Sequence, residues 1–186
     1  MLKRIKSQEE IEGKRKKNQI WIGAILIGLM VLSTAGYAIL NNESTSTKSK
    51  YNGYTFYYNN GYWVVQIQEK QYGFQYLPKD LENVSIAGNY NLQEFSGKVV
   101  YFIGTDPAIS ILLMDIPEIA RYQEACLEGA NCSNSELPIK NCENNLFIFN
   151  SLKNETRVYR INNCIYLEGE GEKAAERFLY KSLGVM

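Results

Sequence analysis

Four cysteines are the side chains best suited to chemistry in this chain, and three of them lie in the stretch CLEGANCSNSELPIKNC. Five residues separate Cys126 from Cys132, nine separate Cys132 from Cys142, and 21 separate Cys142 from Cys164. Thiols at such positions can hold a metal ion, act as nucleophiles or form disulfides.

The spacing and the lack of histidine argue against the first two roles. A structural zinc site usually has ligand pairs with about two to four intervening residues, and no gap here is so short. A nucleophilic cysteine needs a basic partner, most often histidine, and the chain has none. We therefore predict disulfides, with Cys126 joined to Cys132 as a local clip and Cys142 joined to Cys164 across a sheet. A thiol–disulfide factor is an alternative that lacks the usual Cys-x-x-Cys spacing.

Acidic residues form the second candidate for chemistry. Glu168, Glu170 and Glu172 alternate in LEGEGEKAAE, as paired catalytic acids or cation ligands could. A strand that leads into a helix start explains the same spacing, because Glu is favourable near a helix N-terminus. Asp106 is similarly explained as a helix cap. With no phosphate loop or serine elbow, the sequence favours a non-enzymatic protein without catalytic residues, cofactor or metal.

The elements that position these residues begin with an apolar segment, Ile20 to Leu40, which contains no charged residue. As a helix with a rise of about 1.5 Å per residue, it would span about 30 Å, the thickness of a bilayer core. Residues 1–19 before it form a basic tail. The positive-inside rule then predicts a single-pass signal anchor with a cytoplasmic N-terminus and an extracytoplasmic C-terminal domain. Cleavage after Ala35, which would release a secreted domain, is the alternative.

The charge of the chain is unevenly distributed. Of 20 basic and 20 acidic residues, seven and three lie in residues 1–17, so the remainder holds 13 against 17, a net charge of −4. Because phosphate binding needs clustered Lys and Arg, we expect no nucleic-acid partner. The expected partners are the lipid bilayer, through residues 20–40, and a protein at the membrane surface.

A polar stretch, residues 41–52, is expected to be a tether, and residues 53–186 a single α+β domain. Four Asn-x-Ser/Thr sequences would be glycosylation sites of an exported glycoprotein, namely Asn42, Asn83, Asn131 and Asn154.

The first part of the domain reads as a β-meander, with strands near 54–58, 62–68 and 72–77 around an Asn-Gly turn. Its aromatic residues are expected to lie on the two faces of a small sheet, one packed and one at the surface. The alternative is that they form a platform on which sugars or bases stack. These residues are Tyr54, Phe56, Tyr58, Tyr62, Phe74 and Tyr76.

The second part reads as β-α-β-β-α in a mixed sheet. A buried strand is expected at 98–105, followed by two helices, or one kinked helix, over 107–114 and 115–129. Strands are then expected within 145–150 and 156–169. A closing amphipathic helix is expected at 171–184, with Ala175, Phe178 and Leu179 on one face. The function that fits best is a membrane-anchored extracytoplasmic interaction or assembly protein. The alternatives are a module that binds surface glycans or polymers, and the thiol–disulfide factor.

Overall fold

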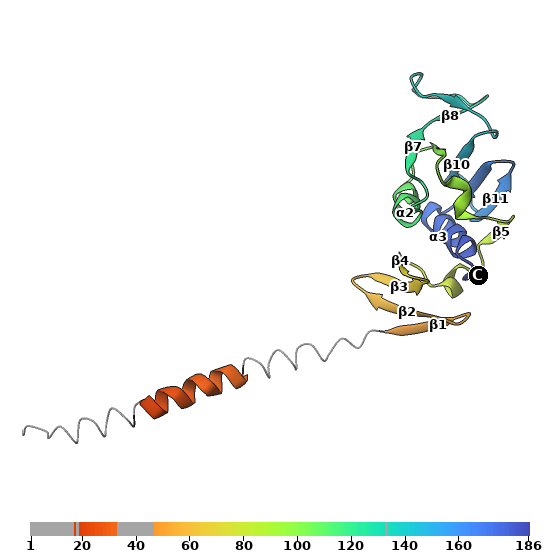
Figure 1. The fold of residues 1–186 in the computed structure, drawn as a ribbon. Helices are drawn as coiled ribbons and strands as arrows, with labels where there is room; N and C mark the ends of the chain where they lie inside the picture. Colours follow the sequence, from red (N-terminus) through yellow and green to blue (C-terminus); the bar gives the residue numbers. More distant parts are fainter. Residues whose placement is uncertain (1–16, 18, 33–46, 133) are drawn as a thin grey trace, which may run out of the picture. The chain divides into compact units, whose positions relative to one another are not determined.

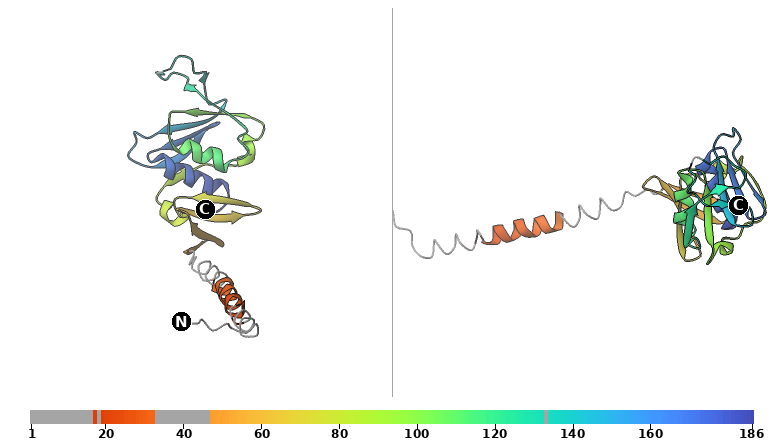
Figure 2. Two further views of the ribbon diagram at one scale, coloured as in Figure 1. Left: turned by 90° about the vertical axis from the view of Figure 1, so that its left-hand side faces the viewer. Right: turned by 90° about the horizontal axis from the view of Figure 1, so that it is seen from above.

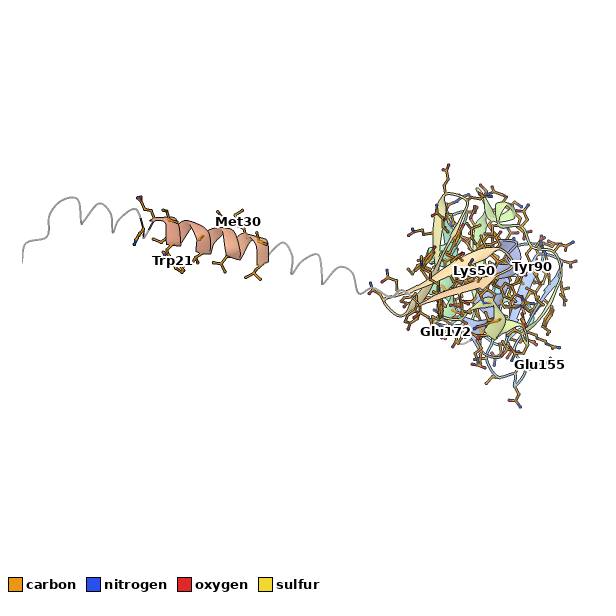
Figure 3. All side chains as sticks on the ribbon, turned by 90° about the horizontal axis from the view of Figure 1, so that it is seen from below. Trp21, Met30, Lys50, Tyr90, Glu155 and Glu172 are labelled. Atoms are coloured by element: carbon orange, nitrogen blue, oxygen red, sulfur yellow. A yellow bond between two sulfur atoms is a disulfide. The ribbon has the colours of Figure 1, made fainter. Side chains whose placement is uncertain are left out.

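The computed structural model describes residues 17, 19–32, 47–132 and 134–186 (Figure 1). The chain divides into two compact units, Met1–Thr45 and Ser46–Met186. In the first unit a helix covers residues 19–32, and the side chains of Trp21 and Met30 are seen along it in Figure 3. Within the described residues, no helix has both the length and the apolar character needed to cross a membrane. Residues 33–40 of the predicted anchor lie outside the described part.

An antiparallel sheet opens the second unit. Its strands, in spatial order, are β1 (Lys48–Tyr51), β2 (Tyr54–Asn59), β3 (Tyr62–Ile67) and β4 (Lys70–Phe74). The Asn52-Gly53 and Asn60-Gly61 turns both have positive φ, which allows two-residue hairpin loops that match the strand twist. The meander is therefore one strand longer than expected, because β1 occupies residues assigned to the tether. Its Lys-Ser-Lys-Tyr sequence is polar because β1 is an edge strand.

A six-stranded mixed sheet forms the other half of the domain, in the order β5-β11-β12-β10-β6-β7. The strands β12, β10, β6 and β7 are parallel to one another, whereas β11 is antiparallel to β12. These strands are β5 (Ser85–Ala87), β6 (Val99–Ile103), β7 (Arg121–Glu124), β10 (Asn145–Asn150), β11 (Arg157–Ile161) and β12 (Cys164–Glu168). The remaining elements are η1 (Pro78–Leu81), η2 (Leu92–Phe95), α2 (Ala108–Asp115), the short pair β8 (Cys126–Leu127) and β9 (Ile139–Lys140), and α3 (Gly171–Ser182).

Two helices lie between the two sheets, so that the domain has a β-α-β layering (Figure 2). On one side of α3, the Tyr180 ring stacks on Phe74 of β4 with centroids 4.0 Å apart. On the other side, Phe178 meets Phe147 of β10 edge to face at 5.3 Å. Helix α3 is thus buried on two faces, and its contacts join both sheets to one core.

The expected helix at 115–129 is wrong. Helix α2 ends at Asp115, and Ile116 has φ −109° and ψ 85°, outside the helical region. Pro117 explains this end, because the ring of a proline disfavours helical geometry in the preceding residue. The chain instead turns and forms the exposed edge strand β7, followed by β8. Elsewhere the α+β class, the antiparallel meander and the mixed sheet are confirmed.

Candidate functional site

The cysteines form two disulfides, with the pairing expected from their positions. Cys142 and Cys164, the core disulfide, have Cα atoms 5.0 Å apart, and Cys164 is buried with Leu146 and Ile148 on the sheet face opposite the helices. Cys126 and Cys132, the loop disulfide, have Cα atoms 6.1 Å apart and connect β8 to the loop that follows it. Cys126 was expected at the end of a helix but lies in strand β8. The loop disulfide therefore links a strand, and not a helix end, to the loop that follows it.

A cavity of about 250 Å³ adjoins the loop disulfide. A reactive cysteine needs nearby positive charge to stabilise its thiolate. Glu124 lines this cavity, and none of its lining residues within the described chain is Lys or Arg. The surroundings of the loop disulfide thus suit a structural bridge better than a redox-active one.

Asn83, Asn131 and Asn154 are all exposed and lie in connections between elements. Asn42 lies outside the described residues.

The aromatic residues of the meander do not form one platform. Phe56 and Phe74 are fully buried against the helices, whereas Tyr58 and Tyr62 are about half exposed. Tyr54 and Tyr76 are half-buried and pack against the core. The six rings therefore divide between core and surface. Alternation accounts for Tyr62, which lies on the sheet face opposite Phe56, whereas Tyr58 shares the face of Phe56 and is still exposed.

The acidic residues considered as a catalytic group do not converge either. Glu168 is buried and accepts hydrogen bonds from Arg157 Nε at 2.6 Å and Tyr159 Oη at 3.1 Å. Burial acts to raise the pKa of Glu168, but these two bonds outweigh it and lower the pKa below its usual value. Glu170 instead pairs with Lys173 at the surface.

Asp106 is a cap, as expected from the sequence. Its Oδ1 accepts the amide of Ala108 at 2.9 Å at the start of α2. The same carboxylate lies against Gly171, at the start of α3, and a Cβ on that glycine would overlap it. Asp106 therefore caps α2 and packs against the start of α3, where only glycine fits beside it.

A groove between β4 and α2 is the feature that the sequence did not predict. Its volume is about 460 Å³. Its apolar lining comes from Tyr62 and Val64 of β3 and from Ile111 and Met114 of α2. The Met114 side chain is 80% exposed and the Tyr62 side chain 50% exposed, which is unusual for large apolar groups that share one depression.

The edge of β4 forms one wall of this groove. Ile67 pairs with Lys70 across the two-residue turn between β3 and β4. In that register Lys70, Tyr72 and Phe74 hydrogen-bond to β3, so the backbone N–H and C=O groups of Gln71 and Gly73 point away from it. These groups have no hydrogen-bond partner within the described part of the chain.

Glu176 of α3 closes the open edge at one end. Its Oε1 accepts the amide of Gln75 at 2.6 Å, and its Oε2 accepts the amide of Tyr76 at 3.0 Å. Tyr180 Oη, one turn further along α3, donates to the carbonyl of Tyr76 at 2.8 Å. The helix thus satisfies the backbone just beyond β4 and leaves the strand itself unpaired on that side.

Three carboxyl groups make the groove acidic, namely Asp115, Glu172 and Glu176. Burial raises the pKa of Glu176 to about 7, against the effect of its two amide hydrogen bonds. Burial likewise raises the pKa of Asp115 to about 6, while Lys70 acts to lower it. None of the lining residues within the described chain is Lys or Arg.

Carboxyl groups with raised pKa values often mark functional sites. Here both oxygens of Glu176 already hold backbone amides, and the described residues contain no group of His, Cys, Asp or Glu able to hold a metal ion. The groove therefore offers recognition of a ligand: an open strand edge, an apolar patch and negative charge. The sequence signal for it was weak, namely a glycine within a strand and a glutamate beside the apolar stripe of an amphipathic helix.

Comparison with protein-family models, with curated proteins and with solved structures finds no match for this chain. Its function must therefore be inferred from the fold and the groove.

Proposed function

We propose that this chain is a single-pass membrane protein that is not an enzyme. Residues 20–40 would anchor it with the N-terminus in the cytoplasm, and the α+β domain would bind another protein on the extracytoplasmic side. Three features support this proposal: the disulfides, the apolar N-terminal helix and the binding character of the groove.

The two disulfides carry the argument for the location. Disulfides persist in oxidising compartments and are rare where cytosolic reductants act. All four cysteines of the chain are paired, and Cys164 is buried at the start of a central strand. A domain built around such a bridge is best suited to an extracytoplasmic location.

The N-terminal helix supports the anchor. Residues 19–32 contain no charged side chain, and Ile20, Trp21 and Leu26 are each more than half exposed. Water is a poor solvent for such a surface, whereas lipid is a good one. The seven Lys and Arg within residues 1–17 would hold the preceding tail on the cytoplasmic side.

A binding role is favoured because the groove presents recognition groups without catalytic machinery. Exposed apolar side chains such as Met114, next to unpaired backbone groups, are typical of interaction surfaces. A domain of this kind would serve assembly at the membrane surface.

The disulfide argument is tested by trapping the thiols in cells that express the full chain. Cells are quenched with acid, accessible thiols are blocked, and the protein is then reduced and labelled with a mass-tagged maleimide. We expect four tags per chain after reduction and none before it. A matched control, the same chain without residues 1–40, should stay in the cytoplasm and have its thiols blocked at the first step. Four blocked thiols in the full chain would contradict the proposal.

A further inference from the structure

We propose that the groove between β4 and α2 binds an extended peptide of a partner protein, which pairs with β4 as a fifth strand and places a Lys or Arg side chain against the groove carboxylates. This inference rests on the proposed function as an interaction protein, and it specifies the site and the chemistry of the partner.

The backbone of β4 provides the first part of the argument. Gln71 and Gly73 each present an N–H and a C=O group on the side of β4 away from β3, two residues apart, which is the repeat of a strand ladder, and Gly73 lines the groove. Gly73 has no side chain, and its exposed position leaves room for another backbone to approach. Strand addition of this kind gives affinity through main-chain hydrogen bonds and specificity through alternate side chains.

The groove lining specifies those side chains. Alternate residues of an added strand would contact the apolar groups of β3 and α2, in particular Tyr62, Ile111 and Met114. Glu172 and Asp115 supply negative charge on the helix side of the groove. Because like charges repel and opposite charges attract across an interface, a basic residue among apolar ones is the complementary sequence.

A second copy of the chain is a poor occupant for the same reason. Pairing two β4 edges would bring the Asp115 and Glu172 carboxylates of both copies to one interface. The opposite edge of the same sheet is also unsuited, because Lys48 and Lys50 occupy the outward positions of β1, and edge lysines discourage strand pairing. The basic peptide of another protein is therefore the occupant that the charges favour.

The probe is a displayed library of random peptides of about nine residues, enough to cover β4 and both flanks of the groove. It is selected on the full chain, immobilised in mild detergent. We expect the retained peptides to carry Lys or Arg with apolar residues at alternate positions. Affinity of one retained peptide is then measured by fluorescence anisotropy.

Two matched pairs of variants locate the peptide. Gly73→Pro removes an outward N–H without removing a hydrogen bond to β3, and Lys50→Pro makes the same change on the opposite edge. Gly73→Pro should weaken binding about tenfold or more through lost backbone hydrogen bonds, and Lys50→Pro by less than about twofold. Glu172→Lys should weaken binding about fivefold or more, whereas Glu136→Lys, in the exposed loop between β8 and β9, should have no effect.

The inference is overturned if no peptide class is retained, if the two proline variants weaken binding equally, or if retained peptides are acidic. Self-association that Gly73→Pro abolishes would overturn it in favour of a second copy. The proposed function is tested by a different experiment, because the thiol trapping can refute it and the peptide selection cannot. A domain with trapped disulfides that retains no peptide would refute only this inference.

Discussion

Replacing Glu176 by Gln should change how the stability of the domain depends on pH. In the folded domain burial raises the pKa of Glu176 to about 7, above its usual value of 4.5. The folded state therefore holds this proton more tightly than the unfolded state. Its contribution to stability is present in full below pH 4.5 and is lost as the pH rises through about 7.

The size of the effect follows from the two pKa values. One pKa unit corresponds to about 1.4 kcal/mol, so the rise from 4.5 to about 7 corresponds to at most about 3.5 kcal/mol. Gln cannot titrate, and its amide group would also oppose one of the two backbone donors, at a cost of about 1–3 kcal/mol that does not vary with pH. Hence the stability advantage of the native chain over Glu176→Gln should shrink by about 2–3 kcal/mol between pH 4.5 and pH 8.

The assay is urea unfolding of the full chain with its disulfides intact, at constant ionic strength and at several pH values. Trp63 fluorescence reports on the meander when Trp21 is replaced by Phe in all variants. Glu155→Gln is the control, because Glu155 is exposed in the turn between β10 and β11 (Figure 3). Its profile should follow that of the native chain. Parallel profiles for the native chain and Glu176→Gln would refute the assignment of a buried, raised-pKa carboxyl.

Three further predictions concern stability. Replacing both cysteines of the core disulfide by serine should lower the free energy of unfolding by about 3 kcal/mol, and the same change in the loop disulfide should lower it by about 2 kcal/mol. The difference is expected because the bridges span 22 and 6 positions. Equal midpoints of urea unfolding for the two variants would contradict this order. Gly171→Ala should clearly lower the melting temperature, because the added Cβ would overlap the Asp106 carboxylate. Gly73→Ala should have a small effect, because there is room for a Cβ at Gly73. A larger loss of melting temperature in Gly73→Ala would contradict the packing of Asp106 against Gly171. The domain should unfold in one calorimetric transition, because α3 packs on both sheets, and two separated transitions would show that the sheets are independent.

Local signals made part of this fold predictable from sequence. The Asn60-Gly61 turn lies between alternating aromatic and β-branched residues, and both the turn and its strands formed where expected. The start of α2 follows from Asp106 and Pro107, which act through neighbouring residues only. The disulfide pairing followed from position in the same way, although the element that contains Cys126 proved to be a strand.

The expected helix at 115–129 failed for an identifiable physical reason. The apolar spacing of Ile116 and Ile119 suggested a helix face, yet both are buried in a turn whose course is set by Pro117. Periodicity alone does not separate these cases, because a buried turn also needs apolar side chains.

The groove was not predictable because it depends on contacts between distant parts of the chain. The amide of Gln75 meets Glu176 across 101 positions of sequence. The stripe of Ala175, Phe178 and Leu179 identified one buried face of α3, but the face with Glu176 and Tyr180 is buried only because the meander folds over it. Nothing in the local pattern of the helix predicts a second sheet.

Protease accessibility in intact cells tests most directly the claim that the domain lies outside the membrane and is anchored by residues 20–40. The full chain carries one epitope at the N-terminus and another after Met186. We predict that added protease removes the C-terminal epitope while the N-terminal one persists until the membrane is permeabilised. A domain that resists protease until permeabilisation, or an N-terminal epitope that is lost first, would contradict the account.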